Sequence, residues 1–105
     1  MWLTCADKKE ADLVAKTLLG KHLAACVRQV PVSSAYRWHG KIELGSEVMI
    51  LAESRSDLFD EVEAEVAKLH SYETFVLEAT AVAKVSKDAK QWLDGELKNE
   101  HTRDS

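Results

Sequence analysis

Short apolar runs alternate with amphipathic helical segments along this chain of 105 residues, and this order constrains the fold more than any single motif. The pattern predicts strands at residues 1–5, 24–30, 48–53 and 74–82. Between 35–38 and 41–44, the glycine-bearing turn His39-Gly40 indicates a hairpin or a bulge. Helices are expected from 7 to about 19, from Ser54 or Ser56 to 69, and from Ser86 to about 97. The order β-α-β-β-α-β plus a C-terminal helix is the ferredoxin-like split βαβ arrangement, an α+β fold with a four-stranded antiparallel sheet.

Individual residues mark where these elements begin and end. Asp7 is expected to cap the first helix, with Glu10 reaching back as in a capping box. Gly20 is expected to supply the left-handed residue that ends this helix. Pro31 cannot donate to a ladder and is expected to stop the second strand, and Gly45-Ser46 is expected to turn the chain again.

Each helical pattern presents one apolar face, and Leu13 in the first helix points away from it. The apolar faces consist of Ala11, Val14, Ala15, Leu18 and Leu19 in the first helix, Phe59, Val62, Val66 and Leu69 in the second, and Ala89, Trp92, Leu93 and Leu97 in the third.

The strands are apolar on both faces, which predicts that both faces of the sheet are covered. In the third strand Val48, Ile50 and Ala52 alternate with Met49 and Leu51, and the last strand has the same character. The two long helices cover one face in this topology, and a single further helix is too small to cover the other. We therefore expect a second copy of the chain to pack there, as a homo-oligomer.

Charge and hydropathy exclude several partners. The 14 basic and 18 acidic residues give a net charge of −4, which disfavours nucleic acid and anionic membranes as main partners. No apolar run approaches the roughly 20 residues that span a bilayer, so no membrane insertion is expected. Charged residues from Asp7 to Glu10 interrupt any hydrophobic leader, and a cytoplasmic location is expected. We expect a single domain over residues 1–99, followed by a polar tail, residues 100–105.

The motifs of common enzyme classes are missing, and no enzymatic activity is expected. The chain lacks the glycine-rich phosphate-binding signatures, the zinc-protease helix and the nucleophile elbow. The first strand leads into Thr4-Cys5-Ala6-Asp7, a loop without glycine whose carboxylate would repel a phosphate.

His70-Ser71-Tyr72-Glu73 is the segment most suggestive of a ligand site. His70 and Glu73, three residues apart, could converge on one cation, since imidazole and carboxylate bind copper and zinc. A purely structural interpretation also stands, in which His70 interacts with carbonyls at the end of the second helix while Glu73 is solvated.

The two cysteines are expected to be reduced thiols. Cys26, within the second strand, suits a small core residue more than a soft ligand for Cu(I), and Cys5, at the end of the first strand, is expected to be the more accessible. The aromatic residues Tyr36, Trp38 and Tyr72 suit either stacking on a ligand or anchoring a subunit interface.

Taken in order, four motifs resemble those of the CutA family, the divalent-cation tolerance proteins. That family shows T-C-P-D, L-A-A-C-V, Y-x-W-x-G-K-I-E and H-P-Y-E, over nearly the whole chain. The corresponding segments here are Thr4-Cys5-Ala6-Asp7, Leu23-Ala24-Ala25-Cys26-Val27, Tyr36-Arg37-Trp38-His39-Gly40-Lys41-Ile42-Glu43 and His70-Ser71-Tyr72-Glu73.

The resemblance implies a ferredoxin-like protomer in a tight homotrimer, with a non-enzymatic role in metal-ion homeostasis and weak binding of copper or another divalent metal. No organic cofactor is implied, and His70 and Glu73 carry over as the metal candidates. The chain departs from the family at Ala6 and Ser71, where proline is usual, at Val76, which replaces a carboxylate, and at Leu3, where a thiolate site would need cysteine.

Two other functions remain open from the sequence. The trimer resembles PII-type signalling proteins, so a regulatory role is the alternative, with a small effector bound in intersubunit clefts near Tyr36, Trp38 and Tyr72. A third possibility is a structural trimer that anchors another protein.

Overall fold

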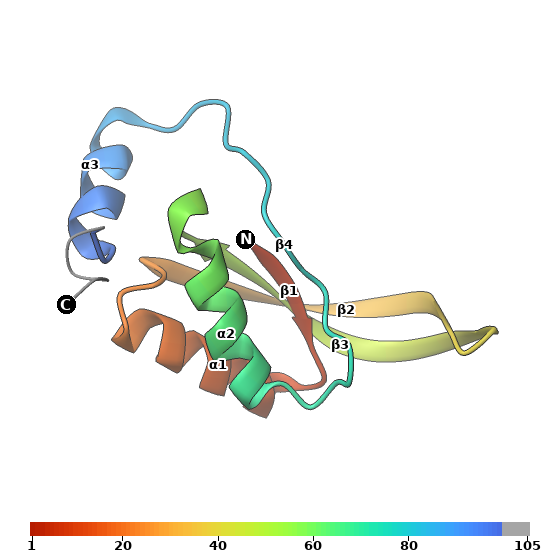
Figure 1. Ribbon diagram of the computed structural model, residues 1–105. Coiled ribbons are helices and arrows are strands. Elements are labelled where there is room, and N and C mark those ends of the chain that lie inside the picture. Colours follow the sequence, from red (N-terminus) through yellow and green to blue (C-terminus); the bar gives the residue numbers. More distant parts are fainter. Residues whose placement is uncertain (100–105) are drawn as a thin grey trace.

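The computed structural model describes residues 1–99, and the predicted tail, residues 100–105, lies outside the described residues. The elements follow the predicted order, with a short 3-10 turn before the second helix (Figure 1). They are β1 (Trp2–Cys5), α1 (Lys8–Gly20), β2 (Cys26–Trp38), β3 (Lys41–Glu53), η1 (Ser56–Leu58), α2 (Phe59–Leu69), β4 (Leu77–Glu78) and α3 (Lys87–Glu96).

The four strands form one sheet in the order β2-β3-β1-β4, and every neighbouring pair is antiparallel. This order confirms the ferredoxin-like prediction. The short strand β1 lies between two partners, so that Leu3 pairs with Ile50 of β3 on one side and with Leu77 of β4 on the other.

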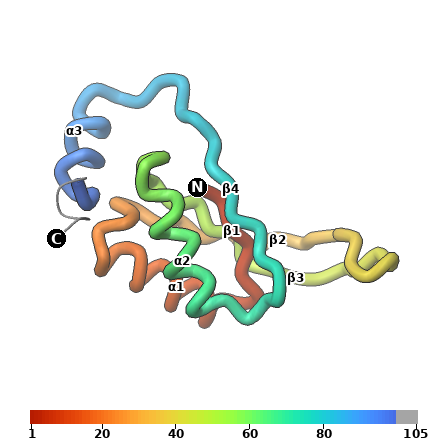
Figure 2. The backbone as a smooth tube through the Cα atoms, viewed as in Figure 1, coloured from red at the N-terminus to blue at the C-terminus, as the bar shows by residue number. Residues whose placement is uncertain are grey.

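The β2–β3 hairpin is much longer than predicted. Each strand has 13 residues, and Figure 2 shows the hairpin projecting well beyond the two helices. The strand stop at Pro31 and the turn at Gly45 were wrong, because β2 is an edge strand, whose free side tolerates a missing N–H, and Pro31 pairs with Val48. The turn at His39 and Gly40 is confirmed, and their φ angles of 50° and 76° match a tight two-residue hairpin turn.

The last strand is shorter than the predicted 74–82. Only Leu77 and Glu78 pair, with Leu3 and Trp2 of β1. Because β1 has only four residues, the chain after Glu78 runs past its end without a strand partner within the described residues. Val82 in this segment is 68% exposed.

The start of α1 is capped as predicted. The Asp7 carboxylate accepts a hydrogen bond from the Glu10 N–H at 2.9 Å, and the Glu10 carboxylate accepts from the Ala6 N–H at 2.7 Å. The end of α1 differs: Gly20 is the last helical residue, and His22, with φ 58°, is the residue in the left-handed region.

The predicted serine side-chain caps of the other two helices do not form, and Arg55 and Leu58 hold the N-cap positions of η1 and α2. Ser54 donates to the Leu23 carbonyl at 2.7 Å instead of capping, and η1 leads into α2. Ser86 holds the N-cap position of α3, but its side chain makes no capping hydrogen bond.

The core lies between α1, α2 and one face of the sheet, as the helical patterns predicted. Leu19, which was predicted to lie on the apolar face of α1, is exposed. Leu13, which was predicted to point away from that face, is 47% exposed. Buried core residues are Leu3, Cys5, Ala11, Val14, Leu18, Leu23, Ala24, Ile50, Ala52, Leu58, Val62, Val66 and Leu97.

The third helix leaves the second sheet face open. None of its residues is buried and Trp92 is half-exposed. Figure 1 shows α3 at one end of the molecule, after a long connection, where the N–H of Lys98 donates to the His22 carbonyl at 2.8 Å. Among residues 1–99, no helix is long and apolar enough to cross a membrane.

Truncation of a core side chain tests this packing. Leu58 is fully buried, and we expect Leu58→Ala to lower the free energy of unfolding by about 2–5 kcal/mol through lost burial and the cavity left behind. Leu13→Ala, at an exposed position of α1, is the matched control and is expected to change it by less than about 0.5 kcal/mol. Urea unfolding at one fixed protomer concentration measures both, and equal effects would contradict the described core.

Candidate functional site

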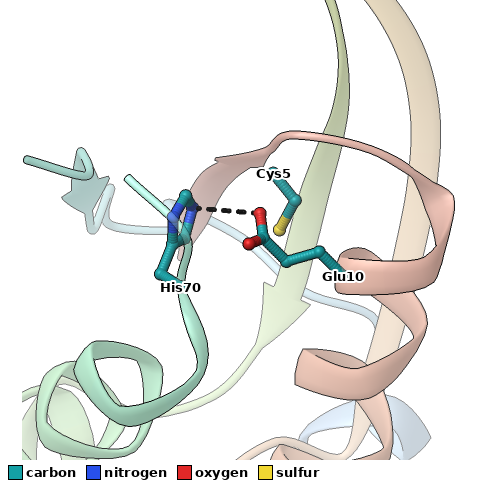
Figure 3. Close-up of side chains that lie close together, drawn as sticks. All are labelled: Cys5, Glu10 and His70. Carbon is teal, nitrogen blue, oxygen red and sulfur yellow. Dashed lines mark ion pairs between the residues drawn. The ribbon is translucent and has the colours of Figure 1, made fainter. Parts of the chain in front are cut away.

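Three separate elements bring a thiol, a carboxylate and an imidazole together. Cys5 ends β1, Glu10 lies in the first turn of α1, and His70 directly follows α2. One ligand atom from each residue lies within 4.8 Å of the other two, and Figure 3 shows the three side chains converging. We call this group the Cys5–Glu10–His70 cluster.

The His70 ring is held by hydrogen bonds at both nitrogens. The backbone N–H of Tyr72 donates to Nδ1 at 3.1 Å, and Nε2 lies 2.8 Å from the Thr4 carbonyl, to which it donates. The ring also stacks on Phe75, with centroids 5.4 Å apart, and its side chain has no exposed surface. His70 therefore has structural contacts, but the predicted partner was wrong: the carbonyl that it binds belongs to Thr4 in β1 and not to the end of α2.

The Glu10 carboxylate connects α1 to the segment after α2. Its two oxygens accept from the backbone N–H of Ala6 and of Ser71, each at 2.7 Å, and Oε2 lies 3.7 Å from Nε2 of His70. Burial opposes ionisation, but the hydrogen bonds from Ala6 and Ser71 and the nearby His70 ring outweigh it and hold the pKa of Glu10 below its usual value. The carboxylate is thus kept charged inside the cluster.

The burial of the two cysteines is the reverse of what was predicted. Cys5, predicted to be accessible, is fully buried, while Cys26, predicted as a core residue, is only partly buried. The reason is register: Cys5 pairs with Val48 on the helix-covered side of the sheet, whereas Cys26 pairs with Glu53 near the end of the edge strand. Burial, followed by the charges of Glu10, Asp7 and Glu47, raises the pKa of the Cys5 thiol to about 12.

Glu73 is not part of the cluster in the described chain. It is exposed, and it lines a separate shallow groove with Glu63 and residues 74–77. The physical reason is that α2 ends at Leu69 and the backbone of His70 is extended, with ψ 136°. The three-residue spacing therefore does not place both side chains on one helix face.

The three aromatic candidates lie in two places: Tyr36 and Trp38 are in β2 on the hairpin, and Tyr72 lies in the segment after α2. Tyr72 donates from its hydroxyl to Oε2 of the buried Glu47 at 2.6 Å. Burial, this hydrogen bond and the nearby charges of Glu47 and Tyr36 raise the pKa of Tyr72. Trp38 instead lies at the end of β2, edge-on to His39 with centroids 4.7 Å apart.

Glu10, Cys5 and Glu47 were not assigned to this site from the sequence. Glu10 was interpreted only as part of a helix cap, and that interpretation is correct but incomplete. A signal existed in the topology: β4 is antiparallel to β1, so the segment entering β4 must lie beside the end of β1 and the start of α1.

The fold and this site define a class of small α+β proteins with a ferredoxin-like sheet. The family model described as "CutA1 divalent ion tolerance protein" matches residues 1–96. A divalent-cation tolerance protein CutA from Archaeoglobus fulgidus is 38% identical over 94 residues, which cover 90% of this chain and 92% of that protein. The Pyrococcus horikoshii protein of the same name is 34% identical, covering 93% and 96%.

A solved structure described as the periplasmic divalent cation tolerance protein CutA from A. fulgidus has a TM-score of 0.90 to this fold. It is 37% identical and covers 92% of this chain and 95% of its own. The chain therefore belongs to the CutA family.

Glu10→Gln tests the carboxylate that joins α1 to the loop after α2. An amide has one acceptor oxygen for two N–H donors, so we expect a loss of about 1.5–3 kcal/mol in the free energy of unfolding near neutral pH. Because the pKa of Glu10 is lowered by folding, its contribution is present above its unfolded pKa and is lost as the pH falls through the folded value. Unfolding curves from about pH 6 to 3 should therefore converge for the two proteins, and parallel curves would contradict this role.

Tyr72→Phe tests the buried Tyr72–Glu47 contact. Removing the hydroxyl leaves the Glu47 carboxylate without this donor, and we expect a loss of about 1–3 kcal/mol in the free energy of unfolding at pH 7. The control is Tyr36→Phe on the exposed hairpin, expected to change it by less than about 0.5 kcal/mol. Thermal or urea unfolding compares them, and an unchanged Tyr72→Phe protein would show that the contact contributes nothing.

Proposed function

We propose that the protein is a homotrimeric, non-enzymatic protein of metal-ion homeostasis that supports tolerance of divalent cations, copper among them. It binds copper or another divalent metal weakly near His70, without an organic cofactor, and acts in the cytoplasm. Membership of the CutA family over residues 1–96 carries this proposal, since the relatives are named divalent-cation tolerance proteins.

The surface of the single chain supports self-association. Along β3, residues 41–47 pair only with β2, so their other edge has no strand beside it in the described chain. Apolar side chains are exposed on the projecting hairpin and on the segment around β4, and such surfaces are typical of subunit interfaces. They are Val30, Tyr36, Trp38, Ile42, Leu44, Val76, Val82 and Val85.

The donor set around His70 supports a metal role. Thiol, imidazole and carboxylate are ligands of zinc and copper, and the Cys5–Glu10–His70 cluster holds one of each. Glu73 remains a second carboxylate candidate, and it is accessible to solvent.

A PII-like regulatory trimer is the second candidate. Tyr36 and Trp38 are 47% and 38% exposed on the hairpin, where a neighbouring subunit would form a cleft with aromatic walls. This function predicts an effector that raises the melting temperature of the metal-free trimer and changes Trp38 fluorescence.

Native mass spectrometry of the purified chain, titrated with copper and then zinc, tests the proposed function. We expect a species of three times the 11.7 kDa protomer mass that takes up metal in steps of up to one ion per protomer. His70→Ala should lose this uptake. The control is His22→Asn, because asparagine tolerates the positive φ of that position and the ring lies outside the cluster.

Two results would contradict the proposal separately. A monomer would remove the assembly, and a trimer that stays metal-free at micromolar copper and zinc would remove direct metal binding in favour of the effector-binding candidate.

A further inference from the structure

We infer that Cys5, Glu10 and His70 form one ligand set for a thiophilic divalent cation such as Zn²⁺ or Cd²⁺. The inference rests on the proposed metal role and names the residues that hold the ion, with Cys5 and Glu10 in place of the more obvious Glu73. Its basis is the convergence of three ligand atoms from β1, α1 and the end of α2 (Figure 3).

The spacing of the cluster is close to that of a bound ion. With ligand bonds of about 2.0–2.3 Å, atoms at the corners of a tetrahedron lie about 3.3–3.8 Å apart. Nε2 of His70 and Oε2 of Glu10 are already 3.7 Å apart, and all three ligand atoms lie within 4.8 Å. A contraction of up to about 1 Å would bring all three ligand atoms to the spacing of a bound ion.

A divalent ion balances the charge of the cluster. Before binding, the cluster carries one negative charge, on Glu10, beside a protonated thiol. Uptake of M²⁺ displaces the thiol proton to solvent and leaves a thiolate, a carboxylate and a neutral imidazole around two positive charges, which sum to zero. A neutral group is the least costly to keep at a buried position, where an unpaired charge is strongly disfavoured.

The surroundings favour a cation. The carboxylates of Asp7 and Glu47, together with Glu10, act electrostatically on the Cys5 thiol, and the same negative field attracts a positive ion. The Glu10 side chain is 10% exposed and Ser71 beside it is exposed, which gives an ion a route past Glu10.

Binding also has a structural cost, which explains why it would be weak. When Nε2 coordinates the ion, the ring hydrogen moves to Nδ1, so the hydrogen bond to Thr4 and the one from the Tyr72 N–H are both lost. Ala6 and Ser71 share the Glu10 oxygens with the ion. Hard cations such as Mg²⁺ gain too little from a thiol to offset this, so the site selects softer metals.

Cadmium absorption tests the ligand set, because Cd²⁺ bound to a thiolate gives an ultraviolet charge-transfer band. We titrate the full chain with Cd²⁺ and expect the band in the wild type and in Cys26→Ser, the matched control at the other thiol. The band should be absent from Cys5→Ser. Glu10→Gln, which keeps both thiols, should weaken Cd²⁺ binding by roughly tenfold or more.

The outcomes separate this inference from the proposed function. A band that persists in Cys5→Ser and disappears in Cys26→Ser overturns the ligand set while metal binding stands. The ligand set is also overturned, while metal binding stands, if His70→Ala abolishes uptake but Glu10→Gln binds Cd²⁺ with the affinity of the wild type. Circular dichroism checks folding, and if Cys5→Ser fails to fold, the Glu10→Gln affinity decides. A wild type that takes up no metal overturns the proposed direct binding itself, and this inference with it.

Discussion

The pairing of β1 between β3 and β4 is the interaction on which the rest of this structure depends. The strand has only four residues, yet Leu3 and Cys5 are buried beneath the helices, and Leu3 pairs with strands on both sides. Because β4 enters antiparallel beside it, the segment after α2 is brought against the end of β1. That meeting point is where His70 contacts Thr4 and where Glu10 and Cys5 complete the cluster.

The cluster combines two demands that conflict. As observed, Glu10 stabilises the start of α1 through Ala6 and fixes the following loop through Ser71, while both nitrogens of His70 are bonded. The same atoms are the ligands that a metal would need. Any ion must compete with hydrogen bonds that already stabilise the fold, so tight binding and a rigid metal-free state exclude each other here.

Within residues 1–99, no helix covers one face of the sheet, and residues 41–47 of β3 have a strand beside only one edge. The two long helices cover a single face, and α3 docks at the end of the molecule through Leu97 and Lys98 instead of covering the other. Leu44, 80% exposed on β3, is one of several exposed apolar side chains along the hairpin, and such a group is typical of an interaction surface. Assembly of several copies would account for this distribution, and it agrees with strands that are apolar on both faces.

Local sequence was enough to predict the order of elements, the apolar faces of α1 and α2, the Asp7 cap and the His39-Gly40 turn, because each depends on neighbours within a few residues. It could not determine that β2 continues through Pro31, since this needs the knowledge that β2 lies at an edge. Nor could it show that only two residues of the last apolar run pair. The chain after Glu78 passes the end of β1, and Thr4 and Cys5 make no pair with the residues before Leu77. The partners of His70 depend on the tertiary structure in the same way: Cys5 is 65 and Glu10 is 60 positions away, and only the sheet topology brings them to the same place.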